Sequence, residues 1–121
     1  MTVSGAARIA GVMGWPVDHS LSPSLHGYWL DFYGIDGAYI PLAVYPDRLE
    51  DALRALPALG FAGANLTMPH KEKALNIVDI CDEVATRIGA INTVVVRPDG
   101  SIEGRNTDGR GFLQSVHAGA P

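Results

Sequence analysis

The sequence is short of several features that would assign a protein class directly. Its 121 residues include one cysteine, Cys81, so the chain can form no internal disulfide, as is usual in a reducing compartment. No apolar run approaches the ~20 residues of a membrane-spanning helix, and residues 1–7 are too short and polar for a signal peptide. The net charge is −4, and no basic stretch stands out as a nucleic-acid surface. We therefore expect a cytoplasmic protein that binds neither membranes nor nucleic acids.

The chain also lacks the glycine-rich strand–turn–helix fingerprint of dinucleotide-binding domains. Gly109-Arg110-Gly111 has no third glycine at the required spacing and no βαβ unit after it. The sequence gives no indication of a metal site, and we expect none.

The composition itself is that of a compact α/β domain. With 47% hydrophobic and 18% charged residues, 121 residues suffice for one core, so we expect a single domain over residues 1–121. Short apolar segments predict strands at residues 8–14, 38–44, 61–66 and 90–96, with a hairpin partner at 101–103. Helical spacing predicts helices between and after them, starting at Pro23, Pro46, Pro69, Asp82 and Asp108. This alternation favours a three-layer α/β/α fold with a mostly parallel mixed sheet.

Four short polar clusters interrupt the apolar pattern, each where a strand should pass into a helix or turn. They are Ser20-Leu21-Ser22-Pro23, Asn65-Leu66-Thr67-Met68-Pro69-His70-Lys71, Ile91-Asn92-Thr93 and Asn106-Thr107-Asp108. Open α/β sheets bind ligands just past the carboxyl ends of their strands. Together the clusters supply hydroxyls, amides, a lysine and a carboxylate, which suit a small, hydroxyl-rich anion.

Several of these residues also have ordinary structural explanations. Ser22 before Pro23, Thr67 before a helix, and Asp108 each fit a helix N-cap. For Ser22 capping and binding are compatible, because a helix N-terminus carries free N–H groups and a partial positive charge that favour a carboxylate. The hydroxyls of Ser20 and Ser22 can donate to both oxygens of such a group.

Lys71 carries the most chemistry of the candidates. A cation in the first turn of a helix opposes the helix dipole by about 0.3–1 kcal/mol, so Lys71 needs an acidic partner, a ligand or a lowered proton affinity. Asp108 is predicted to follow a strand as well, and a Lys–Asp pair would couple a proton donor to a group that tunes its charge. Asn92 interrupts an apolar strand pattern, where its amide must brace a loop or face a ligand.

In order and spacing, the four clusters resemble those of the shikimate dehydrogenases. These are NADP-dependent enzymes of aromatic amino-acid biosynthesis that interconvert 3-dehydroshikimate and shikimate. The resemblance spans Gly11 to about Phe112 and includes His26 and Gly89.

The resemblance implies roles for residues of all four clusters. The implied substrate contacts come from Ser20, Ser22, Thr67, Lys71, Asn92 and Asp108. Ser20 and Ser22 would hold the shikimate carboxylate, and Thr67, Asn92 and Asp108 the ring hydroxyls. Lys71 would be the general acid/base with Asp108 alongside, and Glu83 would lie near the NADP.

Shikimate dehydrogenases also contain a Rossmann domain that binds NADP, which these residues do not include. We therefore expect the N-terminal substrate-binding domain of such an enzyme, inactive alone, with the C-terminal domain missing from this chain. Arg105, beside the substrate loop, leaves quinate open as a substrate, and a non-catalytic regulatory module that binds shikimate or quinate is a further alternative. An exposed interdomain surface could also mediate homodimerisation.

Overall fold

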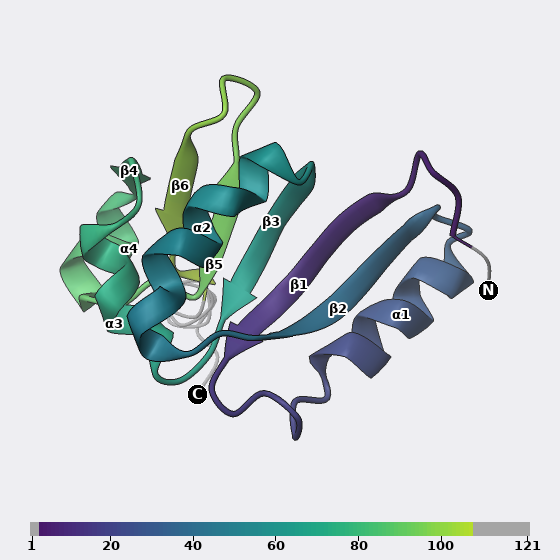
Figure 1. Cartoon of the computed structure of the whole chain (residues 1–121), viewed down its shortest axis with the longest axis horizontal. Helices are drawn as coiled ribbons and strands as arrows, with labels where there is room; N and C mark the ends of the chain where they lie inside the picture. The colour runs from purple at the N-terminus through teal and green to yellow at the C-terminus, as the bar shows by residue number, and fades with distance from the viewer. Residues whose placement is uncertain (1–2, 108–121) are drawn as a thin grey trace, which may run out of the picture.

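The fold is built on a mixed sheet with helices on both faces (Figure 1). The computed structural model describes residues 3–107, and in this part of the chain the six strands have the order β2-β1-β3-β5-β6-β4. The strands are β1 Arg8–Gly14, β2 Gly37–Ala43, β3 Phe61–Leu66, β4 Ile80–Cys81, β5 Thr93–Val96 and β6 Ile102–Arg105. The helices are α1 Ser22–Phe32, α2 Leu49–Ala58, α3 His70–Lys73 and α4 Glu83–Ile88, with 3-10 turns η1 Pro46–Arg48 and η2 Ala74–Asn76.

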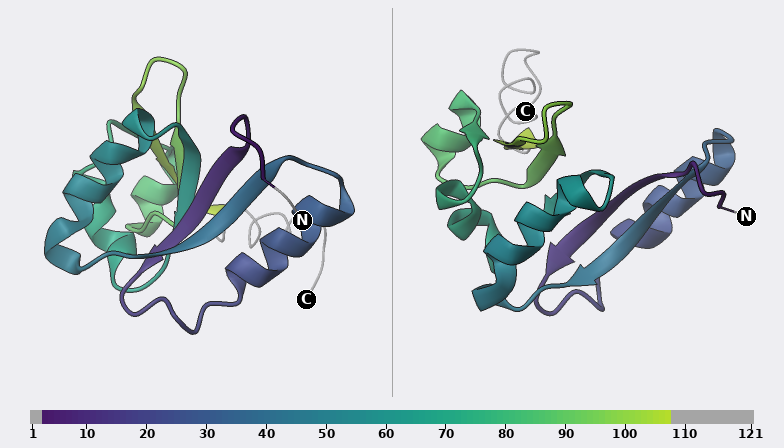
Figure 2. Two further views of the ribbon diagram at one scale, coloured as in Figure 1. Left: turned by 45° about the vertical axis from the view of Figure 1, so that its right-hand side comes forward. Right: turned by 45° about the horizontal axis from the view of Figure 1, so that its top comes forward.

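The strand connections explain why the helices cover both faces. Strand β1 pairs in parallel with β2 on one side and with β3 on the other. The chain steps from β1 to β2 in one direction and then across β1 to β3, and right-handed crossovers place the two connecting helices on opposite faces. Figure 2 shows α1 and α2 in this arrangement. Strand β5 is antiparallel to β3 and β6, whereas β4 is parallel to β6, so the predicted α/β class with a mostly parallel mixed sheet is confirmed.

Most elements lie where the sequence pattern predicts them. Strands β1 and β3 have the predicted bounds, and β2 is shifted by one residue toward the N-terminus. Helix α1 ends before Gly34, whose φ of +64° is the left-handed conformation in which glycine commonly follows a helix.

Four local details differ from expectation. Ser22 is the first residue of α1, whose N-cap is Leu21, so the predicted Ser22 cap is wrong. The helix after Pro69 is divided into α3 and η2 and stops at Asn76. Asn92 precedes β5 and does not lie within it. Strand β4 was not predicted, because two residues carry no periodicity; the helix expected from Asp108 lies outside the described residues.

The main core fills the space between the sheet and α2. Leu49, Leu53 and Leu56 recur at helical spacing on α2 and are at most 1% exposed. They belong to one hydrophobic cluster with side chains from the strands: Met13, Ala64, Leu66, Val94 and Ile102. Helix α1, in contrast, buries none of its residues.

Candidate functional site

Three of the four polar clusters meet where β1, β3 and β6 end and β5 begins. The Thr67 N–H donates to the Met13 carbonyl at 2.9 Å, and the Leu66 N–H donates to the Asn92 carbonyl at 2.9 Å. The Asn92 N–H in turn donates to the Arg105 carbonyl at 3.0 Å. Because β5 is antiparallel to both neighbours, its first residues lie beside their last ones. This end of β1 and β3 is also where the strand order reverses, the usual ligand position of an open α/β sheet.

A chain of side-chain hydrogen bonds links these clusters. The Asn65 amide donates to Thr93 Oγ1 at 3.2 Å, and the Thr93 hydroxyl donates to Asn92 Oδ1 at 3.0 Å. Asn92 Nδ2 then donates to Thr107 Oγ1 at 3.1 Å, and the Thr107 N–H returns a bond to Asn92 Oδ1 at 3.0 Å. Asn92 is 8% exposed, so its buried amide braces the start of β5 against the end of β6.

Tyr39 on β2 extends this network to α1. Its hydroxyl donates to Asn65 Oδ1 at 2.7 Å, and the His26 ring of α1 stacks on its ring with centroids 4.1 Å apart. Burial raises the pKa of Tyr39, and the Ser22 hydroxyl beside it opposes that rise. Sequence reasoning missed Tyr39, since a tyrosine inside a strand is what strand propensity alone favours.

The three residues predicted to bind the substrate through hydroxyl groups, Ser20, Ser22 and Thr67, are all half-buried. The Ser20 hydroxyl accepts the Ser22 N–H at 3.3 Å, which orders the entry into α1. Thr67 is not the cap of α3, because the N-cap of that helix is Pro69. A Cβ on Gly14 would collide with the Thr67 side chain, so the glycine that ends β1 makes room for Thr67.

Lys71 lies in the short helix α3, at the same end of the sheet. Its carbonyl accepts the Ile91 N–H at 2.8 Å, which places Lys71 beside the segment that carries Asn92. Lys71 is half-buried, whereas Lys73 is exposed and donates to the Pro46 carbonyl at 2.7 Å.

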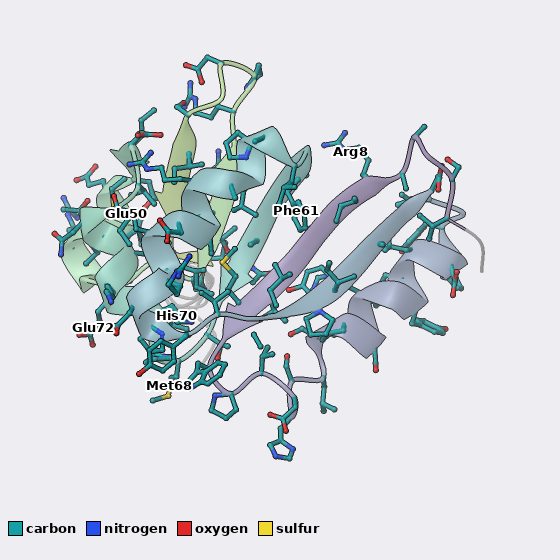
Figure 3. All side chains as sticks on the ribbon, in the orientation of Figure 1. Arg8, Glu50, Phe61, Met68, His70 and Glu72 are labelled. Atoms are coloured by element: carbon teal, nitrogen blue, oxygen red, sulfur yellow. The ribbon has the colours of Figure 1, made fainter. Side chains whose placement is uncertain are left out.

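His70 fastens α3 to the residue after β2. The His70 side chain is fully buried, and its Nε2 lies 2.8 Å from the Val44 carbonyl. Figure 3 labels His70 near the lower end of α2. Burial lowers the pKa of His70; the Val44 carbonyl opposes this and the charge of Lys73 adds to it. A neutral ring that donates through Nε2 fits this position, and within residues 3–107 the buried Nδ1 has no hydrogen-bond partner.

Glu83 and Arg105 do not take part in the side-chain hydrogen bonds that link Asn65, Thr93, Asn92 and Thr107. Glu83 is exposed at the start of α4, where its side chain forms an ion pair with Arg87. Arg105 donates to Glu103 at 2.7 Å, and this bond, together with Arg97, lowers the pKa of Glu103. Asp108 lies outside the described residues.

The described residues do not fit a dinucleotide's pyrophosphate. The turn after β1 contains Trp15 and Pro16 where a Rossmann fold has its glycines. Pro23 removes a backbone donor from the first turn of α1. Over residues 3–107, no cluster of three or more histidine, cysteine or acidic residues could hold a metal ion. The same stretch contains no helix with the length and apolarity that crossing a membrane requires.

Known proteins share both the sequence and the fold of this chain. The family model of the shikimate dehydrogenase substrate binding domain matches residues 12–94. The shikimate dehydrogenase (NADP(+)) of Paramagnetospirillum magneticum is 61% identical over 119 residues, covering 98% of this chain and 43% of that protein.

Solved structures agree. Shikimate 5-dehydrogenase from Thermus thermophilus, in complex with NADP(H) and shikimate, has a TM-score of 0.82 and 40% identity, covering 93% of this chain and 42% of its own. The ligand-free 5-ketofructose reductase of a Gluconobacter species has a TM-score of 0.86 and 31% identity, covering 95% and 41%.

The chain spans less than half the length of the curated relatives it matches. The similarity nevertheless covers nearly all of this chain, and the family model alone covers more than half of it. The chain therefore belongs to the family of shikimate dehydrogenase substrate-binding domains.

Proposed function

We propose that this chain is the substrate-binding and catalytic part of an NADP-dependent shikimate dehydrogenase, which reversibly reduces 3-dehydroshikimate to shikimate. The observation that carries the proposal is the meeting of three polar clusters at the reversal of the strand order, in a chain of this family. Relatives named shikimate dehydrogenase (NADP(+)) support the same activity.

The carboxylate of the substrate would bind at the entry into α1. Ser20 and Ser22 are half-buried there and carry hydroxyls that can donate to two carboxylate oxygens. The Ser20 oxygen also holds the Ser22 backbone, which lowers the freedom that the pair loses on binding.

The ring hydroxyls would meet Thr67, Asn92 and Asp108. The amide of Asn92 has two N–H donors, and Thr107 takes one of them among the described residues. The second N–H is the donor that we assign to a ring hydroxyl.

Lys71 would move the proton of the reaction. During reduction its ammonium would protonate the oxygen of the developing alkoxide, and in the reverse direction its amine would accept that proton, with Asp108 alongside. NADPH would supply the hydride. Residues 3–107 contain no glycine-rich turn for its pyrophosphate, so we propose that the main NADP site lies outside this stretch, in a C-terminal NADP-binding domain, with Glu83 as a peripheral contact.

The decisive experiment compares Lys71→Met with Lys73→Met in the longest form of the protein that its gene encodes. We expect Lys71→Met to lower kcat by about 10²–10⁴-fold with a smaller change in the KM for shikimate. Lys73→Met removes an equal charge two residues away and should leave kcat within about threefold, because Lys73 is exposed and its ammonium donates to the Pro46 carbonyl.

Steady-state NADP+ reduction provides the measurement. Near-normal turnover in Lys71→Met would move the proton-transfer role to Asp108. A wild-type protein that neither binds nor oxidises shikimate would rule out the function itself, including the regulatory module that binds shikimate.

A substrate panel separates the remaining alternatives. Shikimate, quinate and 5-ketofructose should be compared by kcat/KM with NADP(H), the last because a 5-ketofructose reductase shares the fold. We expect shikimate to be preferred over quinate. Arg105, the residue that left quinate open, is paired with Glu103 on the hairpin, and in this pairing it does not serve to bind the additional hydroxyl group of quinate.

We further propose a cytoplasmic protein, and homodimers through the face that would meet an NADP-binding domain. Sedimentation at several concentrations tests the second point: a concentration-independent monomer contradicts it.

A further inference from the structure

Helix α1 is held weakly by apolar packing. None of its residues is buried, and a groove of about 270 Å³ lies between the helix and the sheet, lined in part by His26, Trp29 and Tyr39. Burial of apolar surface is the usual source of a helix's fixed position. Something else must therefore set where the first turn of α1, with Ser22, lies relative to the sheet.

Tyr39 makes directional contacts that can fix the position of the first turn of α1 relative to the sheet. Its ring stacks on His26 at an interplanar angle of 15°, and the Ser22 hydroxyl lies beside its own hydroxyl. On the other side, the same hydroxyl donates to Asn65 Oδ1 at 2.7 Å. A hydrogen bond fixes both distance and direction, which stacking and apolar contact do less strictly.

The Asn65 amide carries this constraint further. Because its Oδ1 accepts from Tyr39, its Nδ2 is turned toward Thr93 and the Asn92 carbonyl, to which it donates at 3.2 and 3.3 Å. Tyr39 thus stands between the first polar cluster and the third, on a path made of hydrogen bonds at every step after Ser22.

We propose that Tyr39 is a positioning residue that fixes the separation between the Ser20–Ser22 hydroxyl pair and Asn92. It thereby makes the site selective for a ring whose carboxylate and hydroxyls stand at that separation. This inference rests on the proposed function, in which Ser22 meets the carboxylate and Asn92 a ring hydroxyl.

The test measures selectivity for the carboxylate, which a merely structural role would not change. Shikimate and its methyl ester are compared by kcat/KM in the longest form of the protein that the gene encodes. Tyr39→Phe keeps the stacking surface and removes the hydroxyl. We expect its acid-over-ester ratio to fall by about tenfold, mainly through KM for shikimate.

Tyr28→Phe is the matched control, because Tyr28 is 60% exposed on α1 and loses the same atom. It should leave the ratio unchanged. Ser22→Ala should lower the ratio as well, and Tyr39→Phe in the Ser22→Ala background should add less than about threefold, since both changes act through one contact. Thermal midpoints of both variants well above the assay temperature exclude unfolding as the cause, even if Tyr39→Phe is the less stable of the two because it loses the hydrogen bond to Asn65.

The outcomes are distinguishable. A wild-type protein without turnover, or without preference for the acid, overturns the proposed function and this inference together. A wild-type preference that Tyr39→Phe leaves intact overturns only the inference. Fully additive effects of Ser22→Ala and Tyr39→Phe also contradict it, because the two residues would then act independently.

Discussion

Helices α1 and α2 cover opposite faces of one sheet and are attached to it in different ways. Helix α2 inserts Leu49, Leu53 and Leu56 into the core, each at most 1% exposed. Helix α1 buries none of its residues. Its aromatic side chains Tyr28, Trp29 and Phe32, with Tyr33 after them, remain 44–65% exposed and contact one another in both edge-to-face and stacked pairs. The difference indicates that, among the described residues, the hydrophobic core that stabilises the fold lies mainly on the α2 face of the sheet.

Strand β3 shows the same division residue by residue. Ala64 and Leu66 belong to the core cluster, and Asn65 between them bonds Tyr39, which stacks on α1. Because successive side chains of a strand point to opposite faces, one strand can serve both purposes.

The sharpest contrast is between leucines of the two helices. Leu53→Ala should lower the free energy of unfolding by about 2–5 kcal/mol, because it leaves a cavity in a closed core. Leu25→Ala, at a side chain that is 55% exposed on α1, should cost less than about 0.5 kcal/mol. Urea unfolding measures both losses, and equal values would show that the two helices are attached to the sheet equally strongly.

Substitutions of Gly14 and Gly27 compare a crowded position at the candidate site with an open position on α1. Gly14→Ala should destabilise by about 1–3 kcal/mol and raise the KM for shikimate, because the new methyl group displaces Thr67. Gly27→Ala meets no atom within 4 Å and should stabilise α1 by up to about 1 kcal/mol. Unfolding curves with substrate kinetics supply the measurement; an undisturbed KM in Gly14→Ala argues against Thr67 as a ligand.

The stack of His26 on Tyr39 should contribute less to the free energy of unfolding than the packing around Gly14. His26→Ala removes the ring that lies on Tyr39 and should cost about 0.5–1.5 kcal/mol. His19→Ala, at a side chain that is 94% exposed, is the control and should change almost nothing. Thermal unfolding of both variants decides whether the stack anchors the helix.

The smallest effect on the free energy of unfolding is expected from the protonation of His70 in α3 below neutral pH. The pKa of His70 is lowered from 6.5 by burial, so the unfolded chain takes up the proton more readily than the folded one. Stability from neutral His70 is complete above pH 6.5 and declines as the pH falls toward the lowered value.

Unfolding free energies between about pH 7 and pH 5 measure this decline, and His70→Gln should reduce it. The carboxyl groups of Asp79 and Glu103, whose pKa values are lowered from 3.8 and 4.5, add their own losses only in more acid solution. A His70→Gln variant with the wild-type slope would assign the decline to another group.

The sequence predicted local elements well because their signals are local. The bounds of β1 and β3 followed from short apolar runs, and Gly34 marked the end of α1. The place of Asn92 in an apolar pattern predicts an amide that is braced or bound, and in the structure Thr107 braces it. The roles of Lys71, Thr67 and the serines remain predictions until substrate binding is measured.

Other parts could not be read from the sequence. Strand β4 has two residues and exists because it pairs with β6, not because of a pattern of its own. The predicted Ser22 cap was wrong, since local spacing cannot distinguish an N-cap from the first residue of a helix.

The alternation of strands and helices, the polar clusters at their junctions and the family to which the chain belongs all follow from the amino-acid sequence. The position of Tyr39 between Ser22 and Asn65, in contrast, is visible only in the folded chain. That meeting depends on strand register and on the side of the sheet to which each crossover returns. Both are set by contacts between residues distant in sequence, which no local pattern records.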